Sequence, residues 1–420
     1  MFHIAAYNNQ YLRMEQNTLQ AVLSLNVDSV LNVAPAPLAL AIALDRSGSM
    51  DGPKMRAARD GAIKVVQALD EQMLFLVVVF NENARITFGP VLANAENKKR
   101  AIQHLQMVNA NGGTRMSNAL NAIVEKLGQN RSYATKVLFL TDGRNEGEKR
   151  ELLNQAIERC QAANISISAW GVGTDWDAAE LRAMADSTHG TADIIPSPDQ
   201  VESAFVAAFR EIRKTALTQT RLQLWTPAGV TVQRIQQVFP NLVPLGLEPD
   251  PANARQVLVG LGSFAAGAQY EYLVDLSVPI YPPGQQFLML RPSIKYLAGG
   301  KDEVEEKSER SGWVFVQWTE DHALAAQIEQ HIAHYTNQEE LAHVIKAGQE
   351  ALAQGDRDKA TRLLGQALEM SERTRNEHIT RLLSTIVLRD ANGTIRLNTQ
   401  ADAVARKTLA INVGRTSKLK

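Results

Sequence analysis

The chain has 420 residues, with 44 Lys and Arg against 45 Asp and Glu, so its formal charge is −1. This balance provides no broad positive field, and we expect no nucleic-acid partner. A single cysteine, Cys160, excludes a disulfide framework. The sequence has no apolar run of the roughly 18 residues that a membrane span needs. Residues 1–10 lack the basic and apolar regions of a signal peptide, which favours a cytoplasmic location.

The first 36 residues have strand character, most clearly over residues 18–27, where polar and apolar side chains partly alternate. This segment is too short to fold alone. We therefore expect residues 1–36 to join strands that come later in the chain.

A short apolar run over residues 38–44 predicts a strand buried on both faces, and it ends abruptly in polar residues. In the extended backbone just past a strand, alternate residues point the same way, so Asp45, Ser47 and Ser49 can converge on one point. One carboxylate and two hydroxyls are hard oxygen donors of the kind that Mg²⁺ or Mn²⁺ prefers. A divalent cation site is therefore expected at this strand end.

The next 170 or so residues alternate between predicted strands and helices, as a doubly wound, mostly parallel sheet requires. Thr114 precedes a predicted helix, and Asp142 follows a predicted strand within Thr141-Asp142-Gly143. Such positions lie at the carboxyl edge of a parallel sheet, where α/β folds bind ligands. The predicted strands cover residues 73–80, 136–140 and 165–170, and the predicted helices cover residues 55–69, 117–127, 148–163, 178–185 and 201–215.

These residues resemble the metal-ion-dependent adhesion site of von Willebrand factor A (VWA) domains, whose pattern is D-x-S-x-S, then a threonine, then an aspartate in a TDG-like turn. The resemblance implies a Rossmann-like VWA domain over residues 37–215. It also implies Ser47, Ser49 and Thr114 as metal ligands, with Asp45 and Asp142 binding directly or through water. With two carboxylates the loaded site would be roughly neutral and open to an Asp or Glu side chain of a partner protein. The alternative is that the serines merely cap a helix and that Asp142 sits in an ordinary turn.

Residues 216–320 contain short runs, several of them alternating, separated by Pro, Gly and Asn, which predicts an antiparallel β-sandwich. The VWA domain would be inserted in this sandwich or followed by it, a layout similar to that of some bacterial VWA proteins. The dense charge run over residues 301–310 is expected to be a solvated hairpin tip or loop.

Residues 321–400 have a helical pattern, including one helical hairpin that resembles a tetratricopeptide repeat. A single repeat cannot bury its own face, so we expect the hairpin to pack on the sandwich or on a partner. Residues 401–420 end in a basic stretch that predicts a flexible tail, in which Thr408 and Thr416 are possible phosphorylation sites.

Two catalytic or metal alternatives remain weak. His331, His334 and His343 could suggest zinc, but the H-E-x-x-H arrangement is missing. Ser47 with His189 and Asp142 could suggest a hydrolase triad, but no Gly-x-Ser-x-Gly elbow surrounds the serine. We therefore expect no catalytic residues and no organic cofactor.

The sequence thus favours a metal-dependent protein–protein interaction module, whose Mg²⁺ (or Mn²⁺) site captures an acidic side chain. The resemblance implies an intracellular bacterial regulatory or assembly system, linked to a MoxR-type AAA+ ATPase or to serine/threonine kinases, phosphatases and forkhead-associated (FHA) domain proteins. The alternative is a surface or secreted adhesin that binds an extracellular ligand.

Overall fold

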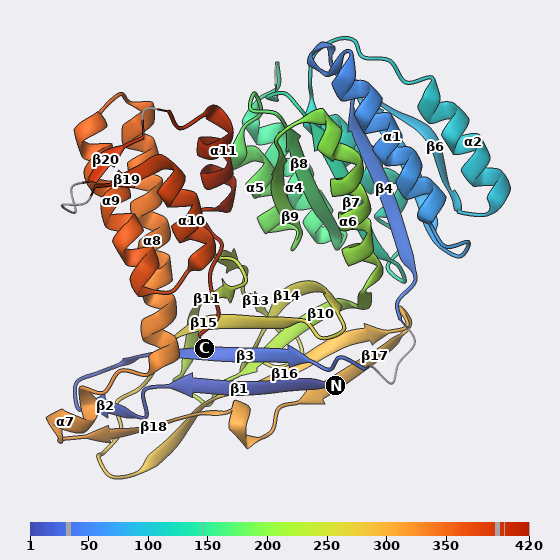
Figure 1. Ribbon diagram of the computed structural model, residues 1–420. Coiled ribbons are helices and arrows are strands. Elements are labelled where there is room, and N and C mark those ends of the chain that lie inside the picture. The colour runs from blue at the N-terminus through green and yellow to red at the C-terminus, as the bar shows by residue number, and fades with distance from the viewer. Residues whose placement is uncertain (31–34, 146, 391–394, 399, 420) are drawn as a thin grey trace.

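The computed structural model describes residues 1–30, 35–145, 147–390, 395–398 and 400–419. Figure 1 shows three groups of elements: an α/β unit, a unit of two β-sheets, and a group of helices that follows them in the chain. The last helix of this group, α11 (Ala403–Asn412), lies next to the α/β unit.

The α/β unit contains a six-stranded sheet in the order β6-β5-β4-β7-β8-β9. All neighbours are parallel except β5 and β6, and both central strands, β4 and β7, are buried along their whole length. The predicted doubly wound, mostly parallel sheet is therefore confirmed. Its strands are β4 (Leu38–Asp45), β5 (Leu74–Phe80), β6 (Ala84–Leu92), β7 (Ala134–Thr141), β8 (Ile165–Val172) and β9 (Thr191–Ile195).

Helices cover both faces of this sheet and form a separate apolar core with each face. One core includes side chains of α1 (Pro53–Ala68), α2 (Ala95–Gln106) and α6 (Val201–Arg213). The other includes side chains of α3 (Met116–Leu127), α4 (Arg150–Ala162) and α5 (Ala178–Ser187). Short 3₁₀ helices lie at η1 (Gly48–Met50) and η2 (Pro198–Gln200).

The register of the central strands brings two polar strand ends together. Leu44 of β4 pairs with Leu140 of β7, so Asp45 and Thr141 follow side by side at the carboxyl edge. The sequence pattern does not reveal the edge strand β6, because Gly89 and Pro90 interrupt it and its side chains are only partly buried.

The two-sheet unit combines the first strands of the chain with strands that follow the α/β unit. One sheet has the order β1-β3-β15-β11-β12, and the other has the order β13-β14-β10-β16-β18-β2, with β17 paired to β16. Both sheets contribute to one apolar core. The strands are β1 (Phe2–Asn8), β2 (Tyr11–Arg13), β3 (Thr18–Val27), β10 (Thr215–Trp225), β11 (Thr231–Phe239), β12 (Val243–Leu245), β13 (Glu248–Pro249), β14 (Gln256–Ala265), β15 (Gln269–Ser277), β16 (Gln286–Ala298), β17 (Asp302–Lys307) and β18 (Val314–Thr319), with η3 at Arg310–Gly312.

The charge run over residues 301–310 differs from the expected loop. Residues 302–307 form β17, which pairs with β16 in antiparallel register. Four of its five charged side chains are exposed, whereas Glu306 is half-buried and Val304 packs against the core, so few inward-facing side chains and backbone pairing suffice for an edge strand.

The helical group has its own apolar core and also contacts the two-sheet unit. Near the start of α8, Ile332 and Tyr335 pack against Val22, Val238 and Leu273 of the five-stranded sheet. The elements of this group are α7 (His322–Ala325), α8 (Gln330–Ala353), α9 (Arg357–Arg373), α10 (Glu377–Ile386), β19 (Val387–Arg389), β20 (Ile395–Leu397) and α11 (Ala403–Asn412).

The prediction of a flexible tail is wrong for most of residues 401–420, because residues 403–412 form α11 and the next residues bind the rest of the protein. Leu409, Ile411 and Val413 are buried, and this apolar set stabilises the helix against its neighbours. Lys407 donates a hydrogen bond of 2.5 Å to the carbonyl of Trp176 in the α/β unit. The basic residues of this stretch predict a tail, but its apolar residues decide how it packs.

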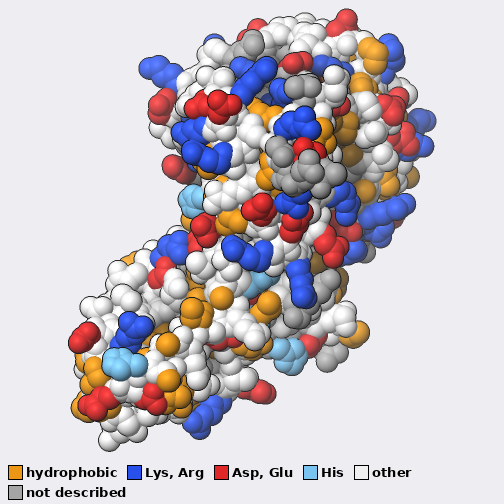
Figure 2. Space-filling model, turned by 60° about the vertical axis from the view of Figure 1, so that its left-hand side comes forward, with side chains coloured by type: hydrophobic (Ala, Val, Ile, Leu, Met, Phe, Trp, Pro, Cys, Tyr) orange, Lys and Arg blue, Asp and Glu red, His pale blue; other side chains and the backbone are white. Residues whose placement is uncertain are grey.

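Charged side chains of both signs are interspersed on the face shown in Figure 2. Among the helices that the structure describes, we find none long and apolar enough to cross a membrane.

Candidate metal site

The five predicted metal residues come from three segments that meet at the carboxyl edge of the six-stranded sheet. Asp45 ends β4, and Asp142 directly follows β7. Ser47 and Ser49 lie in the turn that leads to α1, and Thr114 precedes α3. Contacts among these residues are therefore set by the register of β4 and β7 together with the loops that follow them.

The carboxylates of Asp45 and Asp142 are fully buried, and each oxygen accepts a hydrogen bond. Asp45 Oδ1 accepts from the backbone N–H of Ser47 at 2.7 Å, and Oδ2 accepts from Thr141 Oγ1 at 2.6 Å. Asp142 Oδ1 accepts from Ser49 Oγ at 2.7 Å, and Oδ2 accepts from Lys54 Nζ at 2.5 Å. Both side chains are thus held in fixed orientations.

The three hydroxyls lie around the turn that contains Asp142 and Gly143. Ser47 Oγ and Ser49 Oγ are 3.1 Å apart. A Cβ atom added to Gly143 would lie 3.5 Å from both Ser49 Oγ and Thr114 Oγ1, so the serine of the first segment and the threonine of the second face the same glycine of the third. Among the described residues, the Thr114 hydroxyl makes no hydrogen bond, and its residue is 3% exposed.

The loop that carries Thr114 is held by two residues that sequence reasoning missed, Asn81 and Glu82. Asn81 Nδ2 donates to the carbonyl of Asn111 at 3.0 Å, and Glu82 Oε1 accepts from the backbone N–H of Gly113 at 2.6 Å. Gly112 has a φ of 80°, and a Cβ there would collide with Glu82 Oε2. The signal was present, because two polar residues directly follow the buried run of β5.

Lys54 is a further missed residue. It is the second residue of α1, and its ammonium forms an ion pair with Asp142. The side chain of Lys54 is 27% exposed, whereas that of Asp142 is 0% exposed. A lysine at this position carries no signal in the sequence, because only the fold brings its ammonium to Asp142.

Burial raises the pKa of Asp45 to about 6, although hydrogen bonds from Thr141 and Ser47 act in the opposite direction. The nearby carboxylate of Asp142 raises this pKa further. A buried carboxylate with a raised pKa gains more from a neighbouring cation than an exposed one does.

The residues present fit a hard divalent cation. Two carboxylates and three hydroxyls supply oxygen donors only, and the Thr114 hydroxyl has no other partner among the described residues. A cluster of three or more His, Cys, Asp or Glu side chains that could hold a metal is absent from the described part of the chain. The donors that this site offers are therefore oxygen atoms, which suits a hard divalent cation.

The histidines of the possible zinc site lie apart in the structure, and so do the residues of the possible hydrolase triad. His331 pairs with Glu329, whereas His334 contacts the carbonyl of Ser417. His189 precedes β9 and packs against Gly262 of the two-sheet unit, so it lies at the sheet edge opposite to Ser47. The geometry brings together neither a histidine metal cluster nor a hydrolase triad.

Residues 38–194 match the model of the von Willebrand factor type A domain family. The chain contains a VWA domain. A solved structure of a von Willebrand factor type A protein from Catenulispora acidiphila is 27% identical, with a TM-score of 0.90 over 100% of this chain and 97% of that chain. The three-part architecture of the present protein is therefore shared along its whole length with that structure.

Curated relatives match shorter parts of the chain. An uncharacterized protein of Synechocystis sp. is 25% identical over 257 residues, which cover 60% of each chain. Inter alpha-trypsin inhibitor heavy chain 4 of Mus musculus is 27% identical over 159 residues, which cover 36% of this chain and 17% of that protein. The chain thus spans less than two thirds of the length of both relatives.

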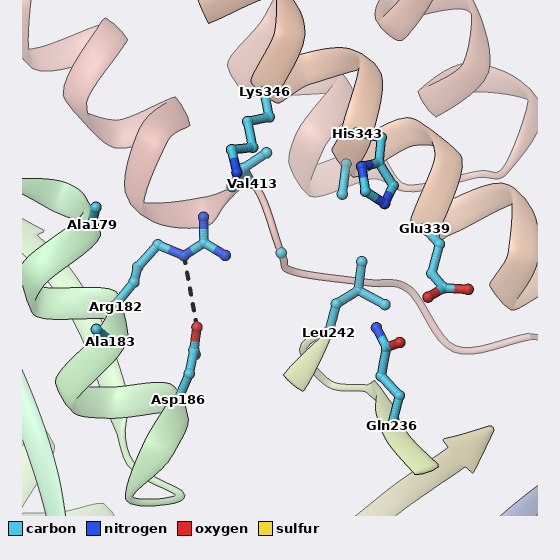
Figure 3. A pocket seen from close by; sticks show the side chains of 12 residues that line it. Ala179, Arg182, Ala183, Asp186, Gln236, Leu242, Glu339, His343, Lys346 and Val413 are labelled. Atoms are coloured by element: carbon cyan, nitrogen blue, oxygen red, sulfur yellow. Dashed lines mark ion pairs between the residues drawn. The ribbon is translucent and has the colours of Figure 1, made fainter. Parts of the chain in front are cut away.

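A separate cavity of about 410 Å³ lies between the VWA domain, the helical group and the two-sheet unit. Figure 3 shows Arg182 and Asp186 of α5 on one side, and Glu339, His343 and Lys346 of α8 on the other. None of the five metal-site residues lines it. Its acidic and basic side chains are balanced, so it shows no clear preference for an ion of either sign.

Proposed function

We propose that this protein is a metal-dependent protein–protein interaction module. Asp45, Ser47, Ser49, Thr114 and Asp142 would hold Mg²⁺ (or Mn²⁺), and the partner would offer an Asp or Glu carboxylate. The observation that carries the proposal is the convergence of two buried, hydrogen-bonded carboxylates and three hydroxyls at the carboxyl edge of β4 and β7. When bound, the cation supplies an electrophilic centre for an anionic oxygen.

The protein's own residues fix the geometry before any partner arrives. Thr141 and the backbone of Ser47 orient Asp45, while Ser49 and Lys54 orient Asp142. The hydroxyl ligands are neutral, so they contribute oxygen without cancelling the charge of the cation. This arrangement supports a binding role, and we propose no catalytic step.

For the cellular setting we propose a bacterial, cytoplasmic regulatory or assembly system. Its partner would be a MoxR-type AAA+ ATPase or a protein of a serine/threonine kinase, phosphatase and FHA-domain pathway. The proposed phosphorylation sites are both engaged, because Thr408 Oγ1 donates to Val404 within α11 and Thr416 Oγ1 donates to the carbonyl of Val238 at 2.6 Å. Modification of Thr416 would therefore require release of the C-terminal segment.

A surface or secreted adhesin is the second candidate, favoured by the same carboxylate-binding geometry. Cell fractionation distinguishes the two proposals, because an adhesin must be found outside the cytoplasm.

The test of metal-dependent binding is a pull-down from native lysate with wild type in Mg²⁺, wild type in EDTA, and Ser49→Ala in Mg²⁺. Ser49 is exposed, so its substitution removes a ligand without opening a cavity in the core, and the cost is one hydrogen bond to Asp142. The matched control is Ser203→Ala, an exposed serine on α6 that bonds only Gln200. A partner retained by wild type and Ser203→Ala with Mg²⁺, and lost in the other two samples, supports the proposal. Equal recovery in all samples contradicts it.

A further inference from the structure

The ion pair between Lys54 and Asp142 lies within the candidate metal site itself. Lys54 Nζ is 2.5 Å from Asp142 Oδ2, while Ser49 donates to the other oxygen of the same carboxylate. Because Asp142 is fully buried, this ammonium is a near and poorly screened counter-ion. Pro53 fixes the start of α1 and so restricts where the Lys54 backbone can lie.

We propose that Lys54 sets the charge of the loaded site and thereby selects an anionic partner group, an inference that rests on the proposed function. Two carboxylates alone would neutralise a divalent cation. With the Lys54 ammonium included, the loaded site keeps one net positive charge. An incoming Asp or Glu carboxylate then binds to a centre of opposite charge rather than to a neutral one.

The same ion pair has a cost in metal affinity. The ammonium repels a divalent cation, and it occupies one lone-pair direction of Asp142 Oδ2. In return, Lys54 neutralises Asp142 when the cation is absent, so the site keeps its shape. Lys54 therefore weakens metal binding. It also preserves the shape of the empty site and gives the loaded site a positive charge.

Removal of the Lys54 charge tests this inference without knowledge of the partner. The variant is Lys54→Met, and the matched control is Lys64→Met, which removes an exposed lysine from the same helix. Isothermal titration calorimetry with Mn²⁺ measures metal affinity. The Mn²⁺-induced relaxation of acetate protons measures carboxylate binding, and thermal unfolding without metal measures the stability of the empty site.

We expect Lys54→Met to bind Mn²⁺ roughly tenfold more tightly, because a repelling unit charge has been removed from a poorly screened position. The same variant should bind acetate more weakly and unfold at a lower temperature without metal, and Lys64→Met should behave as wild type. Equal or weaker Mn²⁺ binding by Lys54→Met, or unchanged acetate binding, overturns the inference.

Failure of the proposed function has a different signature. If Ser49→Ala binds Mn²⁺ as well as wild type does, the cation lies elsewhere and the proposed function falls, whatever Lys54→Met does. If neither wild type nor Lys54→Met binds Mn²⁺, the proposed function and the inference both fail.

Discussion

Ile411 is predicted to anchor the C-terminal helix α11 to the VWA domain. It is 5% exposed and belongs to the apolar core that α3, α4 and α5 form with the sheet. Ile411→Ala removes about three methylene equivalents, which is roughly 2.4 kcal/mol of transfer free energy, and a residual cavity adds to this. We therefore expect a loss of about 3 kcal/mol in the free energy that holds α11 in place.

Amide hydrogen exchange measures this loss locally. A change of about 3 kcal/mol corresponds to roughly a hundredfold faster exchange over residues 403–412 if these amides exchange by local opening. The control is Thr408→Ala, whose half-buried hydroxyl bonds only within α11 and whose loss should change exchange little. If Ile411→Ala and wild type exchange alike, with fast exchange in both, α11 is a flexible tail and the described docking is wrong.

Three further outcomes follow from individual positions. Gly112→Ala should destabilise the protein by about 1–3 kcal/mol, because φ is 80° and the new Cβ meets Glu82, whereas Gly260→Ala, with open space around it, should have little effect on the melting temperature. Burial, assisted by Lys136, lowers the pKa of His189 to about 4. The unfolded chain therefore takes up the proton first as the pH falls from about 6.5 to about 4, and wild type should lose about 3 kcal/mol relative to His189→Asn across that window in urea titrations. Burial raises the pKa of Cys160 to about 12, so iodoacetamide should label this thiol only after unfolding, and labelling of the folded protein would contradict its burial.

The α/β fold could be predicted because its signals are local. The run over residues 38–44 is apolar without interruption and forms a central strand, and polar residues follow it at once. The strand ends and the helix starts then place Asp45, Thr114 and Asp142 at one edge of the sheet. The structure brings the five predicted residues close together, and their role as metal ligands stays a prediction.

The missed features depend on contacts between distant segments. Lys54 is one of many surface-type lysines in the sequence, and only the fold shows that its ammonium reaches Asp142. Helix α11 docks because Ile411 packs into an apolar core whose other residues lie more than 200 positions earlier in the sequence. Edge strands such as β6 and β17 have partly exposed, irregular patterns, so periodicity alone does not reveal them.

The most direct test of the metal site is anomalous diffraction from crystals of the protein grown with Mn²⁺, compared with crystals grown in EDTA. We predict one anomalous peak at the carboxyl edge of β4 and β7, about 2.1–2.3 Å from the hydroxyl oxygens of Ser47, Ser49 and Thr114. A well-ordered site without that peak at millimolar Mn²⁺, with Lys54 still paired to Asp142, would contradict metal-dependent binding at these residues.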